Sequence, residues 1–168
     1  MLFQSIRSGY ERLLECVVIG LMAAIAIVVL LGIGFRTAGA ALVWYDEVAS
    51  ILLAWLTYYG AALAALKRAH IGFPGLVKAM APAWRKLAVL AAEAIVIGFF
   101  ALVAWVGWVV VEILEGDRLV SLPWMPQQLV QSVIPVGAVL FILAQLLSMP
   151  DVWRQAVAAP GRSDTATE

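Results

Sequence analysis

The sequence has very little of what most enzymes and metalloproteins use. It contains one cysteine, Cys16, and one histidine, His70, among 168 residues, and only 13% of its residues are charged. One cysteine cannot form a disulfide within the chain, and one histidine cannot supply both axial ligands of a bis-histidine haem. The H-E-x-x-H, G-x-S-x-G and phosphate-loop motifs are also absent from the sequence. We therefore expect no catalytic residue, no metal site and no cofactor.

The charge balance and the hydropathy indicate where the chain resides. The formal net charge is zero, which argues against nucleic acid as a partner. Hydrophobic residues make up 64% of the chain and the mean hydropathy is +0.99, whereas soluble domains are about 45–50% apolar. These values predict an integral membrane protein.

Four apolar runs are each long enough to cross a bilayer. A helix rises about 1.5 Å per residue, so about 30 Å of hydrocarbon requires roughly 20 residues. The first run is longer than the roughly 7–15 apolar residues of a signal peptide, so we expect it to be retained. The sequence predicts one all-α membrane domain over residues 1–150 and a polar cytoplasmic tail over 151–168. The four predicted spans are residues 16–35, 48–66, 87–111 and 129–149.

Lysine and arginine are distributed unequally between the two sides of these spans. Nine of the eleven lie in the two tails and in the connection between the second and third spans, and only Arg36 and Arg118 lie on the other side. Positively charged loops stay in the cytoplasm. We therefore expect both termini and the middle connection to be cytoplasmic.

Two segments between and within the spans have their own pattern. Residues 73–86 place several apolar side chains on one helical face, which predicts a short amphipathic helix in the membrane interface, with a simple surface loop as the alternative. Pro135 lies inside the fourth span, where it frees a backbone carbonyl and favours a kink. Because lipid cannot satisfy that carbonyl, we expect a neighbouring helix or polar group beside it.

Glu93 is the one carboxylate deep inside a predicted span. A charge at such a depth is costly, and Lys86, two turns earlier on the same face, could neutralise it. Gln145 is expected at a similar depth. Three interpretations stay open for Glu93: a hydrogen-bonded packing carboxyl, an ion or proton relay, and a polar contact with a partner subunit.

The second span is bounded by charges of opposite sign. Asp46 and Glu47 precede an uncharged run, and Lys67, Arg68 and then His70 follow it. Acids at the start of a helix and bases at its end both suit the helix dipole, so this pattern is first of all that of a well-terminated span. Small residues also recur at four-residue spacing within the spans, for example at Gly60 and Ala64, which favours close helix packing.

The stretch from Glu47 to Phe73 resembles the DctQ-like small permease subunit of TRAP transporters, the tripartite ATP-independent periplasmic transporters. The shared pattern is an acid, a dozen apolar residues, Gly60-Ala61-Ala62, the basic pair and then His70-Ile71. The segment 121–143, with Pro123, Pro126 and Ile134-Pro135-Val136-Gly137, is similar to the same family. One departure is Gly72-Phe73-Pro74, where many members carry an acid.

The resemblance implies a non-catalytic scaffold beside a large DctM-like permease subunit that carries the substrate and sodium sites. It also implies a DctP-like periplasmic binding protein that delivers an organic acid such as a carboxylate. We expect contacts with these partners or with membrane lipids from a set of charged, aromatic and helix-breaking residues. The set is Asp46, Glu47, Arg68, His70, Glu93, Arg118, Trp124 and Pro135.

One alternative from a different class is open at this point. The chain would then be a stand-alone or self-oligomerising four-helix transporter that uses Glu93. The substrate cannot be read in either case, because under the resemblance the recognising residues lie in other chains.

Overall fold

The computed structural model describes residues 2–68 and 81–157, and most of these residues are helical. Four of the described helices are long and apolar enough to cross a membrane. This confirms the predicted all-α membrane fold. In chain order the helices are α1 (Leu2–Thr37), α2 (Tyr45–Leu66), α4 (Pro82–Ile113), α5 (Gln127–Gln131) and α6 (Val133–Val157).

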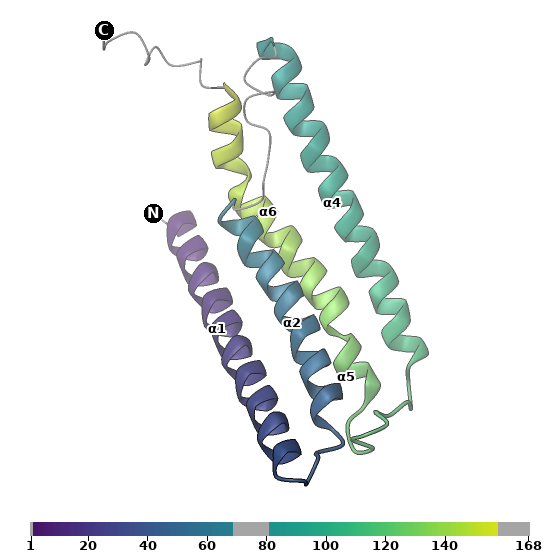
Figure 1. Ribbon diagram of the computed structural model, residues 1–168. Helices are drawn as coiled ribbons and strands as arrows, with labels where there is room; N and C mark the ends of the chain where they lie inside the picture. The colour runs from purple at the N-terminus through teal and green to yellow at the C-terminus, as the bar shows by residue number, and fades with distance from the viewer. Residues whose placement is uncertain (1, 69–80, 158–168) are drawn as a thin grey trace, which may run out of the picture.

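The long helices lie side by side in the order α1, α2, α6, α4 (Figure 1). The extensive contacts join α1 to α2, α2 to α6 and α6 to α4. In the fourth span, Gln127–Pro150, 44% of the most apolar 18-residue stretch is buried. The corresponding stretches of the other three spans are only 6–11% buried. The chain therefore forms an open layer, in which the last helix inserts between the second and the third.

Successive long helices run in opposite directions, so their ends gather into two groups (Figure 1). The terminal end holds the start of α1, the end of α2, the start of α4 and the end of α6. The loop end holds the α1–α2 connection and residues 114–126, which join α4 to α5. The start of α1 and the end of α6 thus lie at the same end of the layer, as four crossings require.

The buried core lies in the half of the layer nearer the terminal end. Its fully buried members are small or aliphatic, and they allow α1, α2 and α6 to approach closely. Phe100 of α4 stacks on Phe141 of α6 with ring centroids 3.7 Å apart, which extends the core to the fourth helix. The core cluster comprises Leu14, Ala62, Ala65, Leu66, Phe141 and Ala144.

The closest helix approaches occur at glycines outside the four-residue pairs that the sequence indicated. A Cβ at Gly137 of α6 would lie 2.7 Å from the Tyr58 Cβ of α2. A Cβ at Gly107 of α4 would lie 2.7 Å from Ile134 and 3.0 Å from the Pro135 ring. Gly60 and Gly98, by contrast, face open space. Spacing alone thus selected the wrong glycines, because it does not say which face of a helix meets a neighbour.

The fourth span is interrupted, as its proline predicted, but the break lies at Ser132, where α5 ends and α6 begins. The Trp55 indole N–H donates to the Val130 carbonyl at 3.1 Å, and the Gln128 amide donates to the Val111 carbonyl at 3.2 Å. Trp55 of α2 is therefore the polar group beside the interruption, but it serves the Val130 carbonyl and not the Gln131 carbonyl, which is the one that loses its helical partner at Pro135. Pro135 itself is buried against α4.

Two boundaries differ from the predicted ones. The helix α4 begins at Pro82, a favoured first position, so residues 82–86 belong to this helix and not to a separate element. Residues 73–80 of the expected interfacial helix lie outside the described residues. The helix α6 continues through Pro150 to Val157, so the segment expected as a tail from 151 begins inside a helix.

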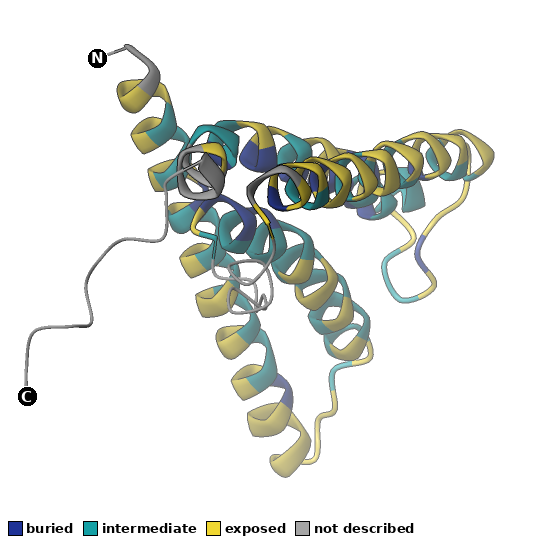
Figure 2. Ribbon diagram, turned by 90° about the horizontal axis from the view of Figure 1, so that it is seen from above, coloured by how far each residue is buried: buried dark blue, intermediate teal, exposed yellow. Residues whose placement is uncertain are grey.

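Large apolar side chains cover the outer surfaces of the layer. Figure 2 shows exposed residues, in yellow, along all of the long helices. On α4 alone, Ile95 is 71% exposed and Trp105 is 72% exposed. Monomeric soluble proteins rarely expose apolar patches of this extent. The layer is therefore built for lipid or for other transmembrane helices.

The Gly137 contact gives a first testable prediction. Gly137→Ala should lower the free energy of unfolding by about 1–3 kcal/mol, because the new methyl group meets the Tyr58 Cβ and forces α2 and α6 apart. Gly98→Ala is the matched control, since its methyl group meets open space and alanine is a better helix former. Unfolding in mixed micelles, followed by tryptophan fluorescence, measures both. Equal stability of the two variants would contradict the close packing of α2 on α6.

Candidate functional site

The charged residues at the two ends of α2 each contact a neighbouring part of the chain. At the loop end, Asp46 and Glu47 lie in the first turn, where free backbone N–H groups favour acids. At the terminal end, Lys67 follows the last helical residue and Arg68 follows Lys67. The two basic side chains reach toward different helices.

Lys67 is directed toward α1. Its Nζ donates to the Glu15 carboxylate at 2.5 Å and lies 3.4 Å from the Glu11 carboxylate. The hydrogen bond to Glu15 raises the pKa of the Lys67 ammonium, although partial desolvation opposes this. Lys67 is therefore a cation at any physiological pH and pairs the end of α2 with the first turns of α1.

Arg68 is directed toward α4. Its Nη1 donates to Glu93 Oε1 at 2.8 Å, and the Gln145 amide of α6 donates to Glu93 Oε2 at 2.6 Å. Glu93 and Gln145 are each only 6% exposed. Both oxygens of the buried carboxylate thus have a donor, one of them cationic, which offsets its desolvation. This polar network joins α2, α4 and α6.

The network differs in one member from the sequence-based expectation. Gln145 does lie beside Glu93, but the neutralising cation is Arg68, whereas Lys86 is exposed. The reason is direction. A helical side chain points toward the N-terminus of its own helix, so Lys86 leans away from Glu93. Arg68, on the antiparallel helix, extends a long side chain toward it.

At the loop end, Glu47 fixes the connection between α4 and α5. Its carboxylate accepts hydrogen bonds from the Ser121 backbone N–H, at 2.9 Å, and from the Ser121 hydroxyl. Two contacts hold the two halves of this connection together. Arg118 Nη1 donates to the Trp124 carbonyl at 3.3 Å, and the backbone of Arg118 forms an antiparallel β-bridge with that of Pro126. The start of α2 and this outer loop therefore form one unit.

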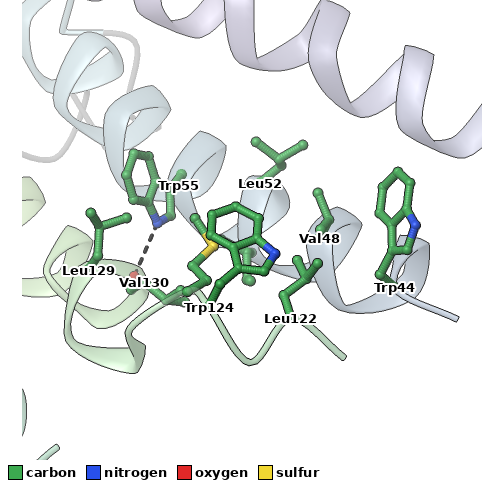
Figure 3. Close-up of a pocket in the computed structure, with 10 residues that line it drawn as sticks. Trp44, Val48, Leu52, Trp55, Leu122, Trp124, Leu129 and Val130 are labelled. Atoms are coloured by element: carbon green, nitrogen blue, oxygen red, sulfur yellow. Dashed lines mark hydrogen bonds between the residues drawn. The ribbon is translucent and has the colours of Figure 1, made fainter. Parts of the chain in front are cut away.

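An apolar groove lies between the outer loop and α2. It has a volume of about 500 Å³, and Trp124 and Leu122 of the loop face Val48 and Leu52 of α2 across it (Figure 3). The Trp55 hydrogen bond to Val130 is at one side of the groove. A groove without polar lining can accept hydrocarbon but offers nothing that could orient a charged solute.

Comparison with known protein families identifies the family of this chain. The family model of the tripartite ATP-independent periplasmic transporters, DctQ component, matches residues 12–155. The chain belongs to this family. The match begins within α1 and ends within α6, so it reaches all four membrane-spanning helices and includes every candidate contact residue. No curated protein matches the chain.

A DctQ protein is the small membrane component of a TRAP transporter and not an enzyme, so this chain is a multi-pass membrane subunit. Within residues 2–68 and 81–157, no three His, Cys, Asp or Glu side chains cluster in a way that could hold a metal ion. The buried polar side chains in these ranges belong to the terminal half, and they are Arg85, Glu93, Gln145 and Ser148.

The candidate contact residues of this DctQ chain fall into two groups. Glu47, Arg68, Glu93 and Pro135 contact other parts of the same chain, as described above. Asp46, Arg118 and Trp124 are exposed at the loop end and remain candidates for contacts with another protein. His70 lies outside the described residues. Sequence reasoning missed the contacts of Ser121, Glu15 and Trp55. Of these, only the contact of Glu15 had a signal in the sequence, because an acid of the first span could pair with the basic residues that end the second span.

The polar network predicts strong coupling between Arg68 and Glu93. Arg68→Gln should destabilise the chain because it leaves a buried carboxylate without its cation. The double variant Arg68→Gln/Glu93→Gln should lose less free energy of unfolding than the two single variants lose together, by about 0.5–3 kcal/mol. Unfolding in mixed micelles measures all three. The control cycle of Lys86→Gln with Glu93→Gln should be additive, and additivity in the Arg68 cycle would show that the pair does not interact.

The Glu47 contact predicts a change confined to the loop end. Glu47→Gln should increase hydrogen exchange at the Ser121 amide about tenfold or more, because a hydrogen bond to a charged acceptor contributes about 1.5–3 kcal/mol. Exchange in the core of α2 should not change. Asp46→Asn, one residue earlier and exposed, is the matched control. If the Ser121 amide exchanges at the same rate in both variants, Glu47 does not hold the loop.

Proposed function

We propose that this DctQ subunit is the fixed scaffold of a sodium-driven importer of an organic acid. It lies in the bacterial inner membrane beside a large DctM-like permease subunit, and a DctP-like periplasmic binding protein delivers the substrate. The terminal end is cytoplasmic and the loop end is periplasmic. The excess of lysine and arginine on the side of the termini supports this orientation.

The observation that carries the proposal is the position of the buried polar groups. Among the described residues these groups belong to the terminal half, and the groove at the loop end is lined by apolar side chains alone. Transporters place polar groups or broken helices near the middle of the membrane to coordinate substrate and ions. A layer without such a series of groups supports a scaffold role and leaves solute handling to a larger subunit.

Glu93 does not favour the alternative of a self-sufficient transporter. Both of its carboxylate oxygens accept hydrogen bonds from Arg68 and Gln145. A proton or ion relay would have to break the Arg68 pair in each cycle, at the cost of leaving two charges buried without partners. The packing interpretation of Glu93 is the one that these contacts support.

The open shape of the layer supports a scaffold of this kind. Exposed apolar side chains on α4 provide a wide surface for other transmembrane helices, and the ends of α2 are tied to both flanks. A domain that slides through the membrane needs a framework that resists tilting. A tied layer of four helices widens that framework without adding a second transport path.

Reconstitution tests the division of labour. Liposomes that contain this chain alone should show no uptake. Liposomes that contain the chain with its large permease subunit should take up substrate when the binding protein and an inward sodium gradient are present. Collapse of the sodium gradient should abolish the signal. Uptake by this chain alone, or full uptake by the large subunit without it, would refute the proposal.

Exposed residues at the loop end test the docking of the binding protein. Asp46→Lys and Arg118→Glu should each lower binding-protein-dependent uptake severalfold, because each reverses a charge on the surface that we assign to the periplasm. The matched control is Lys86→Glu, an exposed charge reversal at the opposite end. All three complexes must assemble with normal yield. Unchanged uptake in both loop-end variants would exclude this surface from docking.

A further inference from the structure

The guanidinium of Arg68 uses only one of its three nitrogens within the described residues. Nη1 pairs with Glu93, while Nε and Nη2 are shielded from solvent and have no hydrogen-bond partner there. A shielded donor without an acceptor costs about 1–3 kcal/mol, and more when it is charged. An acceptor that is not among these residues would remove this cost.

The two unpaired nitrogens lie on the same edge of the guanidinium. Nε and Nη2 point their hydrogens in parallel, which matches two oxygens of a phosphate or a carboxylate. Glu93 occupies the other end of the group through Nη1, so it holds the guanidinium in place and leaves this shielded edge without an acceptor. Lys67 does not compete for the same ligand, because its ammonium pairs with Glu15 and Glu11.

The backbone at Arg68 is held in an unusual conformation. Its φ is 53°, in the left-handed region, and Arg68 is the one non-glycine residue with positive φ in the described part of the chain. Such a conformation costs of order 1 kcal/mol for an arginine and persists where the surroundings fix it. Arg68 follows the C-cap residue Lys67, and a left-handed residue at this position is a common way for a helix to end. The contact of Nη1 with Glu93 orients the guanidinium edge before any ligand arrives.

The level of Arg68 in the layer indicates the chemistry of the ligand. The helix α2 has 22 residues and therefore a length of about 33 Å, close to the thickness of the hydrocarbon core. Arg68 follows two residues after its end, at the depth of lipid headgroups. Basic groups between transmembrane helices at this depth bind anionic headgroups.

We propose that Arg68 binds the phosphate of an anionic phospholipid through its Nε and Nη2 edge. The lipid completes the polar network of Arg68, Glu93 and Gln145 and fixes the terminal end of the layer in its leaflet. The inference depends on the contacts of Arg68 alone. It holds whether or not the chain is the scaffold of an importer, and it can fail without affecting that function.

Native mass spectrometry of the full-length chain, extracted from its own membrane, tests the proposal. The probes are phosphatidylglycerol, phosphatidylcholine with the same acyl chains, and inorganic phosphate. The unmodified chain should retain phosphatidylglycerol more tightly than phosphatidylcholine. Arg68→Gln should weaken this retention about tenfold or more, because two hydrogen bonds to a charged group are lost. Lys86→Gln, which removes an exposed charge at the same end, should retain the lipid normally.

Two further variants separate lipid binding from folding. Arg68→Gln/Glu93→Gln removes both charges of the pair, so it should fold more stably than Arg68→Gln and still bind phosphatidylglycerol weakly. Glu93→Gln keeps the guanidinium and should bind the lipid at least as tightly as the unmodified chain. A double variant that regains tight binding would show that Arg68→Gln acted through misfolding, and it would overturn the proposal.

Three other outcomes would also overturn it. Equal retention of phosphatidylcholine would remove the preference for an anionic lipid. Displacement of phosphatidylglycerol by millimolar inorganic phosphate would identify a site for the free anion. Loss of co-purification with the large permease subunit in Arg68→Gln, with unchanged lipid retention, would assign the guanidinium edge to a carboxylate of that subunit.

Discussion

Two adjacent cations at the end of α2 reach in opposite directions, and the lateral order of the layer depends on them. Lys67 pairs with Glu15 of α1, and Arg68 pairs with Glu93 of α4, which also accepts a hydrogen bond from Gln145 of α6. Apolar packing alone selects neighbours weakly in lipid, since a leucine meets lipid tails as favourably as it meets another leucine. A buried carboxylate, by contrast, is tolerated only beside its donors. The charged pairs thus specify which helices flank α2 at this end.

At the opposite end of α2 an acidic residue, in place of the basic pair, attaches the helix to a neighbouring part of the chain. Glu47 holds the outer loop through Ser121, and Trp55, two turns further along, satisfies the Val130 carbonyl where α5 gives way to α6. Between these two ends the helices are held by close contacts such as Gly137 on Tyr58. An element that is tied at both ends and packed closely between them resists both tilting and sliding. The acid-to-base pattern of this span, which on its own indicates only a well-terminated helix, is in this fold a pair of attachments to its neighbours.

The sequence predicted the spans well because hydropathy and length depend only on the bilayer. It predicted the helical fold, the interruption near Pro135 and a similar depth for Gln145 and Glu93, but not the contact between them. It assigned the wrong cation to Glu93, because a pattern along one helix contains Lys86 but not the reach of Arg68 from an antiparallel helix. It also selected Gly60 rather than Gly137 for close packing. Both errors have the same origin, which is that the order α1, α2, α6, α4 is a property of tertiary contacts and not of any period in the sequence.

The insertion of the last helix between the second and the third explains why the layer stays open. The helix α6 lies between α2 and α4, and Arg68, two residues after α2, reaches past it to Glu93 of α4 at the terminal end. The helices α1 and α4 have broad apolar outer faces. Closing the layer into a bundle would bury those faces, but it would also require α1 to pack against α4 in place of lipid or another protein. An open layer with internal ties keeps its shape while its outer faces stay available to other helices. The scaffold role that we propose for this chain requires this combination of a fixed interior and an unoccupied surface.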